Sequence, residues 1–187
     1  MVTLPWPAFQ KLNASRAQHL VAHLLRLEPH DRRMRFCGVV SDAAIRTYCR
    51  DVDRPGDLMV GFIADGAHRG IGELRPFKGH DGLWAYDLAL SVERAYQDRQ
   101  VGTELMRRLL ILAKNRNAKL VRMHCLPENA KMQRIARKFR AALCFEDGSV
   151  EAHLKPSFPS WASFCEEAIH DSRALSRAWF PASVQAA

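Results

Sequence analysis

The stretch 91–103 (SVERAYQDRQVGT) combines residues that are suited to binding an anion. It joins a predicted strand to a predicted helix, and such a junction presents unpaired backbone N–H groups and the positive end of the helix dipole. Gly102 in the first helical turn would let an anion approach the backbone, and Arg99, Arg107 and Arg108 would add positive charge. The pattern favours phosphate binding, with an ordinary strand-to-helix connection and a solvated basic helix face as the alternative.

Two carboxylates are candidates for moving a proton. Asp87 interrupts the apolar strand predicted over 84–92, where a carboxylate is not expected to face the core without a function. The alternative for Asp87 is an outward side chain that pairs with an arginine. Glu73, on the preceding predicted strand, is the second candidate.

Patterns for other chemistries are weak. His19 and His23 have metal-ligand spacing on a predicted helix, but no third ligand accompanies them, so we expect no metal site. His124 and Cys125 would point to opposite sides of a strand, which disfavours a Cys/His nucleophile. The sequence contains no Gly-x-Ser-x-Gly elbow and no Walker loop.

Positive charge is concentrated in one segment. The formal net charge is +8, and residues 99–140 hold twelve Lys and Arg against Glu104 and Glu128, so the remainder is close to −2. A confined basic block indicates an anionic ligand, either nucleic acid or a phosphorylated small molecule. No recognised nucleic-acid motif surrounds the basic stretch 134–140, so nucleic acid is not the expected partner.

Length and composition indicate an ordinary globular protein. The 187 residues suit one domain with a short appendage, and no apolar run approaches the ~18 residues that span a bilayer. Residues 1–10 lack the pattern of a secretion signal. Five cysteines, an odd number without a Cys-x-x-Cys pair, are expected to be reduced thiols. Together these features predict a cytoplasmic protein without a membrane association.

Apolar periodicity and turn residues predict alternating helices and strands around these candidates. Glu28–Asp31 is predicted to be a turn, Asp42 to cap a short helix, and Asp65-Gly66 to form a hairpin. The expected helices are 13–27, 42–50, one starting at 101, one opened by Asn129 and one within 159–187, and the expected strands are 57–64, 69–74, 84–92, 119–126, 142–145 and 149–154.

Residues 95–105 (AYQDRQVGTEL) resemble the acetyl-coenzyme A signature of the GNAT family of N-acetyltransferases, Gln/Arg-x-x-Gly-x-Gly/Ala at the start of the central helix. Residues 126–132 with 136–139 are similar to the later, Asn-bearing helix of bacterial protein-lysine acetyltransferases, and 31–36 resembles a segment between the first helices of that subgroup. The resemblance covers roughly residues 13–154, and the predicted element order fits the family's fold.

The resemblance implies an α/β acyltransferase domain over residues 1–155, followed by a helical appendage over 156–187. Its sheet would be mixed and mostly antiparallel, flanked by helices, with a V-shaped opening between the middle strands. Acetyl-CoA would lie in that opening. The implied cofactor-binding residues are Leu90, Ser91 and Val92 for the pantetheine arm, Gln97, Asp98, Arg99, Gln100, Val101, Gly102 and Thr103 for the pyrophosphate, and Asn129, whose alternative role is to cap its own helix.

The sequence departs from the family pattern at three places. Gln100 replaces the signature's first glycine, and we expect this side chain to be tolerated through a negative φ. Arg140-Ala141 replaces the usual Gly-Phe after the later helix. Ala136 stands where many members carry a tyrosine that protonates the leaving thiolate, so water is the expected acid.

By this resemblance the chain would transfer acetyl from acetyl-CoA to an amine, either a protein lysine or a small molecule. Asp87 stands where the subgroup carries a strand glutamate thought to remove the amine proton, and Glu73 is the fallback. The alternative is a catalytically weak module that binds acyl-CoA or another protein. The apolar face of the last helix should be buried against this chain or against a second copy in a homodimer; it comprises Trp161, Phe164, Cys165, Ala168 and Ile169.

Overall fold

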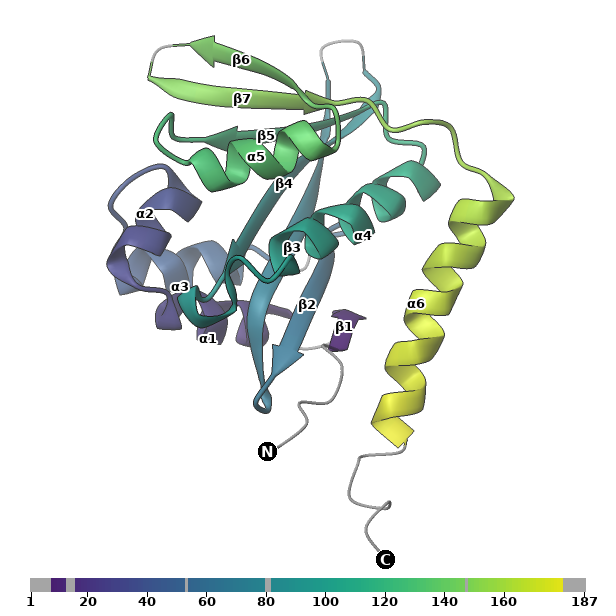
Figure 1. The fold of residues 1–187 in the computed structure, drawn as a ribbon, viewed down its shortest axis with the longest axis horizontal. Coiled ribbons are helices and arrows are strands. Elements are labelled where there is room, and N and C mark those ends of the chain that lie inside the picture. The colour runs from purple at the N-terminus through teal and green to yellow at the C-terminus, as the bar shows by residue number, and fades with distance from the viewer. Residues whose placement is uncertain (1–7, 13–15, 53, 80–81, 147, 180–187) are drawn as a thin grey trace, which may run out of the picture.

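A twisted seven-stranded sheet forms the centre of the molecule in the computed structural model (Figure 1). The structure describes residues 8–12, 16–52, 54–79, 82–146 and 148–179, with side chains up to 172. The strands lie in the order β1-β2-β3-β4-β5-β7-β6, and every neighbouring pair is antiparallel except β4 and β5. Their bounds are Ala8–Lys11 (β1), Leu58–Ala64 (β2), Ala67–Lys78 (β3), Trp84–Val92 (β4), Leu120–Cys125 (β5), Ala142–Glu146 (β6) and Ser149–Leu154 (β7). The predicted mixed, mostly antiparallel α/β fold is confirmed.

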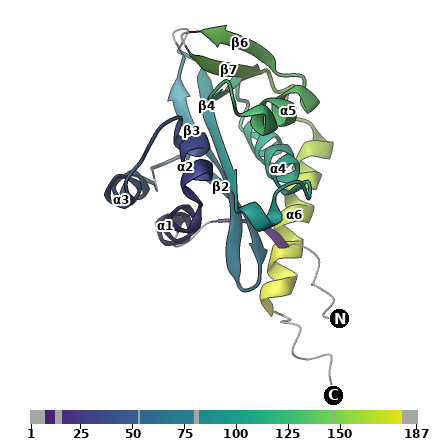
Figure 2. The same ribbon diagram turned by 60° about the vertical axis from the view of Figure 1, so that its left-hand side comes forward.

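Helices cover both faces of the sheet (Figure 2). Three early helices lie on one face, and the three later helices lie on the other. The first group is α1 (Arg16–Arg26), α2 (Pro29–Phe36) and α3 (Asp42–Arg50); the second is α4 (Val101–Asn115), α5 (Ala130–Lys138) and α6 (Trp161–Trp179). A short 3-10 turn, η1 (Arg94–Tyr96), connects β4 to α4.

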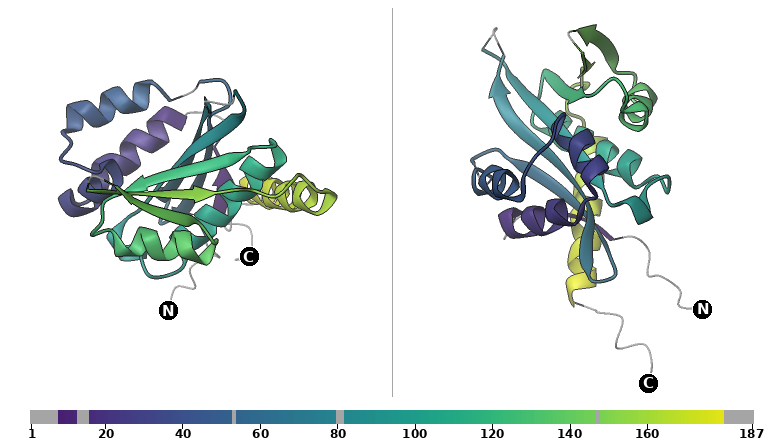
Figure 3. Two further views of the ribbon diagram at one scale, coloured as in Figure 1. Left: turned by 90° about the horizontal axis from the view of Figure 1, so that it is seen from above. Right: turned by 90° about the vertical axis from the view of Figure 1, so that its left-hand side faces the viewer.

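The V-shaped opening lies between β4 and β5. These parallel strands pair only where Ala85–Asp87 face Leu120–Arg122. Beyond that point β4 remains paired with β3 as far as Val92, and β5 remains paired with β7 as far as Cys125. The two halves of the sheet therefore diverge, as the right-hand view of Figure 3 allows the reader to follow.

Two apolar layers hold the helices on the sheet. On the α4 face, Leu105 and Leu109 are fully buried against β3 and β4, and Gly72 permits this packing because a Cβ there would lie 2.6 Å from Leu109 Cδ1. On the opposite face, Leu20 and Ile71 belong to a second buried cluster between α1, α3 and the sheet. The periodic apolar positions in the sequence thus become the faces that fix α1 and α4 on opposite faces of the sheet.

Two expectations for the N-terminal region are wrong, and one strand was not predicted. The predicted turn at Glu28–Asp31 is the start of α2, because Pro29 suits the first turn of a helix, where no intrahelical N–H is needed. Ser41 rather than Asp42 caps α3, its Oγ accepting from the Ala44 amide at 3.2 Å. Strand β1 was not expected; it pairs with β2 at the edge of the sheet.

Helix α6 docks through its polar face, which corrects the expectation of an apolar face buried against this chain. Glu167 lies 2.7 Å from Lys11 Nζ and 3.2 Å from Arg116, and Ser163 is buried. The apolar face points away from the rest of the chain, so burial against a second copy stays a prediction. All five members of that face are exposed: Trp161, Phe164, Cys165, Ala168 and Ile169.

All five cysteines are free thiols. In the described part of the chain, no helix combines the length and apolar character that crossing a bilayer requires.

Candidate functional site

A cleft of about 740 Å³ occupies the opening between β4 and β5, within the usual size range of ligand pockets. The end of β4, the start of α4, the end of β5, α5 and α2 form its walls. Arg99 is the one predicted cofactor residue outside the lining, and its guanidinium lies 5.9 Å from the centre of the Tyr96 ring. The cleft brings together the other predicted cofactor residues: Leu90, Ser91, Val92, Gln97, Asp98, Gln100, Val101, Gly102, Thr103 and Asn129.

The N-terminus of α4 opens into the cleft and has free donors. The amides of Val101, Gly102 and Thr103 donate to no backbone carbonyl among the described residues, since the first bond of the helix runs from the Glu104 amide to the Gln100 carbonyl. Free N–H groups at a helix N-terminus bind anions. Gly102 also meets α5, because a Cβ there would lie 3.0 Å from Ile135 Cδ1.

Gln100 adopts a left-handed conformation, which corrects the expected negative φ. It is the N-cap of α4 with φ of 63° and ψ of 5°, and its exposed side chain makes no capping hydrogen bond. The turn from η1 into α4 requires this conformation, which a glycine adopts without strain and a glutamine does not.

The positive charge at the cleft comes from α5, and from Arg35 and Arg94 elsewhere on its wall, rather than from the arginines of α4. Arg107 and Arg108 pair with Glu104 at 2.8 and 2.6 Å and do not line the cleft. The three cations on α5 that do line it are Lys131, Arg134 and Lys138, which the sequence signals by their i, i+3, i+7 spacing within the basic block.

Lys131 connects the two walls of the cleft. Its Nζ lies 3.0 Å from Gln97 Oε1 and 2.8 Å from Asp98 Oδ2. The hydrogen bond and the charge of Lys131 lower the pKa of Asp98. The loop before α4 and the first turn of α5 are therefore linked through Lys131.

Asn129 caps α5 with one end of its side chain. Its Oδ1 accepts from the Met132 amide at 3.1 Å, which is the capping role. Its amide nitrogen has no partner among the described residues, and the residue lines the cleft. Contact with a ligand therefore stays a prediction that is compatible with the cap.

The two predicted proton acceptors do not line the cleft. Asp87 receives two hydrogen bonds from Arg122, from Nε at 2.7 Å and from the terminal nitrogen at 3.1 Å, which is the outward, arginine-paired alternative. Glu73 is 2% exposed and accepts hydrogen bonds from Arg35, from Tyr48 at 2.9 Å and from Arg75 on the same strand. Their roles as bases stay predictions.

Arg35 connects the buried Glu73 to the cleft wall. It lies on α2, lines the cleft, and its side chain is 8% exposed. Burial by itself would lower the pKa of Arg35, but the Glu73 carboxylate and the Tyr48 hydroxyl raise it above its ordinary value. The guanidinium therefore keeps its charge, and Glu73 is held in a fixed position.

The family resemblance implies that the early helices line the acceptor pocket, and Arg35 of α2 does line the cleft, whereas His124 was not predicted to belong to the site. The cleft wall on this side contains His30, Asp31, Met34 and Arg35 of α2. Both His124 and Cys125 of β5 line the cleft, but His124 is exposed whereas Cys125 is buried in the α4-side core, so the two side chains point to opposite faces as expected. Strand alternation is the signal that identifies His124.

The two histidines on α1 contact side chains of the sheet. His19 packs on the His68 ring with 4.3 Å between the ring centres, and the fully buried His23 makes a 2.9 Å hydrogen bond with Ser91 Oγ. Within the described ranges, no three His, Cys, Asp or Glu side chains gather where they could hold a metal ion.

The model of the acetyltransferase (GNAT) family matches residues 30–140, which is more than half of the chain. The chain belongs to the GNAT acetyltransferase family. The GNAT domain of S. lividans PAT superposes with a TM-score of 0.66 at 17% identity, covering 82% of this chain and 96% of that chain. Ribosomal-protein-alanine N-acetyltransferase from Brucella melitensis superposes at 0.59 with 13% identity, covering 79% and 98%.

A third GNAT-like structure contains a ligand. It is yncA from Salmonella typhimurium with its cofactor acetyl-CoA, at a TM-score of 0.59 and 13% identity, covering 82% of this chain and 96% of that chain. At these identities the similarity to the three structures concerns the fold. No curated protein sequence matches the chain. Membership of the GNAT family supports acetyl transfer as the general class of activity.

Proposed function

We propose that this GNAT protein transfers the acetyl group of acetyl-CoA to a primary amine. The observation that carries the proposal is the cleft between the diverging strands, which ends at the free amides of the α4 N-terminus. A diphosphate needs donors and positive charge, and the pantetheine arm needs apolar walls with free backbone groups. The cleft offers both in one continuous space.

The α4 end of the cleft would bind the diphosphate of CoA. The amides of Val101, Gly102 and Thr103 are free donors, and Lys131 and Arg134 of α5 supply positive charge on the opposite wall. Arg99 would take part through its backbone only, because its side chain turns toward Tyr96.

The β4 wall would bind the pantetheine arm. Beyond Asp87 the β4 edge that faces β5 has no strand partner, so the backbone groups of Leu90–Val92 are available to the amides of the arm. Met132 and Ile135 form the apolar side, and the free amide nitrogen of Asn129 adds a donor.

The thioester of acetyl-CoA, which is consumed as the acyl-donor substrate, supplies an activated acetyl group. The buried core beneath α4 fills one side of the opening, so the amine would approach from the side of α1–α3. For Asp87 to act as base, its bidentate pair with Arg122 would have to open, and Glu73 would act only from within its network of donors.

The proposal is tested by calorimetry with CoA and by thiol release from acetyl-CoA in the presence of lysine peptides and small amines. Gly102→Glu should abolish binding, because the added side chain meets Ile135 and places a carboxylate among the free amides. Gly38→Glu is the matched control, since nothing lies within 4 Å of a Cβ at Gly38 and the residue does not line the cleft.

The outcomes separate the competing functions. Binding with amine-dependent thiol release supports the proposal, and binding without turnover of any amine supports an acyl-CoA-binding module. Absence of CoA binding in the wild-type chain, or equal affinity in Gly102→Glu, would remove the cofactor assignment.

A further inference from the structure

Most acidic side chains around the cleft are held by cations. Asp87 is paired with Arg122, and Glu73 is surrounded by its three donors. A carboxylate that is paired in this way is a poor acceptor for a further proton. The cleft-lining carboxylates are engaged as well: Asp31 with Arg94, Glu128 with Arg33, and Asp98 with Lys131.

His124 differs from all of these groups. It lines the cleft and is exposed, and it makes no hydrogen bond or ion pair with another described residue. Both ring nitrogens are therefore available to a substrate. Histidine is the side-chain type that most often moves protons near neutral pH.

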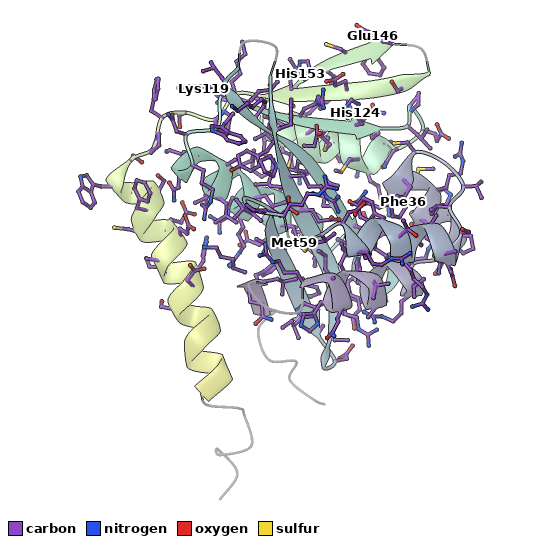
Figure 4. All side chains as sticks on the ribbon, turned by 180° about the vertical axis from the view of Figure 1, so that it is seen from behind. Phe36, Met59, Lys119, His124, Glu146 and His153 are labelled. Atoms are coloured by element: carbon purple, nitrogen blue, oxygen red, sulfur yellow. The ribbon has the colours of Figure 1, made fainter. Side chains whose placement is uncertain are left out.

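The sheet register places His124 at the start of the opening. Asp87 of β4 faces Arg122 of β5 in the last parallel pair, so two residues further along, Ala89 and His124 lie on either side of the gap. Strand alternation puts both on the face that carries Asp87 and Arg122, which is the face of α1–α3. In Figure 4 this face is turned toward the viewer and His124 is labelled.

The neighbours of His124 leave room for an amine. Its counterpart across the gap, Ala89, has the smallest side chain that carries a Cβ, and Met34 and Arg35 of α2 form the wall above. An amine entering from the α1–α3 side would therefore lie between His124 and the β4 edge at Ala89.

We propose that His124 takes the proton from the acceptor ammonium group, an inference that rests on the proposed acetyl transfer. The ammonium nitrogen gives one proton to an imidazole nitrogen and becomes a neutral amine. Its lone pair then forms a C–N bond with the thioester carbonyl carbon as the C–S bond breaks. The departing CoA thiolate takes the second proton from nitrogen, and His124 releases its proton to solvent.

Charged groups of both signs face His124. Glu151 of β7 is its antiparallel partner, and Arg122 is two residues earlier on the same strand. The hydrogen bond from His153 lowers the pKa of Glu151, and the nearby His124 contributes to this lowering. The groups that α2 and the β5–α5 connection contribute to this side of the cleft are His30, Asp31, Arg35 and Glu128.

The kinetic test uses His124→Gln, with His153→Gln as the matched control. His153 is a second histidine on the adjacent strand, does not line the cleft, and is labelled in Figure 4. On an amine that the wild-type enzyme acetylates, His124→Gln should lower kcat by ~10²–10⁴-fold and leave the dissociation constant of CoA unchanged. His153→Gln should keep the kcat of the wild type.

A chemical test of the same inference does not require an amine substrate. Bound acetyl-CoA should shield His124 from diethyl pyrocarbonate, as measured by peptide mass spectrometry, while His153 in the same sample stays reactive. A wild-type protein that binds acetyl-CoA but leaves His124 unshielded would overturn the inference. So would a His124→Gln variant with near-normal kcat, or a loss of kcat in His30→Gln that His124→Gln does not show.

These results are distinguishable from failure of the proposed function. A wild-type chain that does not bind CoA refutes the proposed function, and the inference about His124 with it. A chain that binds CoA and acetylates an amine, yet does not need His124, refutes the inference alone.

Discussion

Replacing Gln100 by glycine should stabilise the protein, because the left-handed conformation at this position suits glycine. The φ of 63° costs an L-residue about 1–2 kcal/mol, and glycine loses about 0.5–1 kcal/mol more backbone entropy on folding. The Gln100 side chain is exposed and makes no capping bond, so little else is lost. The net gain is about 0.5–1 kcal/mol, or a rise in Tm of roughly 1–4 °C for a chain of this length.

The assay combines urea denaturation with calorimetry of CoA binding. Gln97→Gly is the matched control, because Gln97 has a φ of −69° and its side chain donates to the Val92 carbonyl at 2.9 Å. That variant should lose stability. CoA affinity of Gln100→Gly should equal or exceed that of wild type, because a glycine leaves more room beside the free amides of α4. A fall in Tm would refute the strain argument, and a large loss of affinity would make the Gln100 side chain itself a ligand.

Three further predictions concern charge and packing. Asp87→Asn keeps the shape but removes the charge that holds Arg122. Because His124 is the proposed base, kcat on a verified amine should stay near that of wild type, and a loss of ~10²–10⁴-fold would instead identify Asp87 as the base. Hydrogen bonds from His23 and from the guanidinium groups around Glu93 lower the pKa of Glu93 to about 2 despite its partial burial. The stability that Glu93 contributes is therefore present above the ordinary carboxyl pKa of 4.5 and is lost as pH falls toward 2. Urea midpoints measured over that range should fall more steeply for wild type than for Glu93→Gln, and parallel curves would contradict the assignment. Truncation after Ser157 removes the ion pairs of Glu167 with Lys11 and Arg116 and should lower Tm; unchanged Tm and unchanged oligomeric state together would exclude a packing role for α6.

Local patterns in the sequence predicted most of the fold. The apolar stripe that includes Leu105 and Leu109 identified α4, and the run from Trp84 to Val92 identified β4. These elements follow from residues that are close in the chain, where periodicity is informative. The strand-to-helix junction over 91–103 also predicted the free amides at the start of α4, and their role in binding an anion stays a prediction.

Features that depend on distant residues could not be predicted in this way. Asp87 finds Arg122, which is 35 positions away, only after β4 and β5 become neighbours. The positive φ of Gln100 depends on how η1 joins α4 rather than on the residue type. The face on which α6 docks was predicted wrongly, because the apolar stripe suggested burial whereas Glu167 and its cationic partners determine the contact.

The short parallel pairing between β4 and β5 makes the sheet mechanically discontinuous. Three residue pairs, Ala85–Asp87 with Leu120–Arg122, are the whole of the strand pairing between one block of four strands and another of three. A molecule lying in the gap and bonded to the free edge of β4 would act as an additional strand. A bound acyl donor would then connect the two blocks of strands, and the rigidity of the protein would depend on the concentration of that donor.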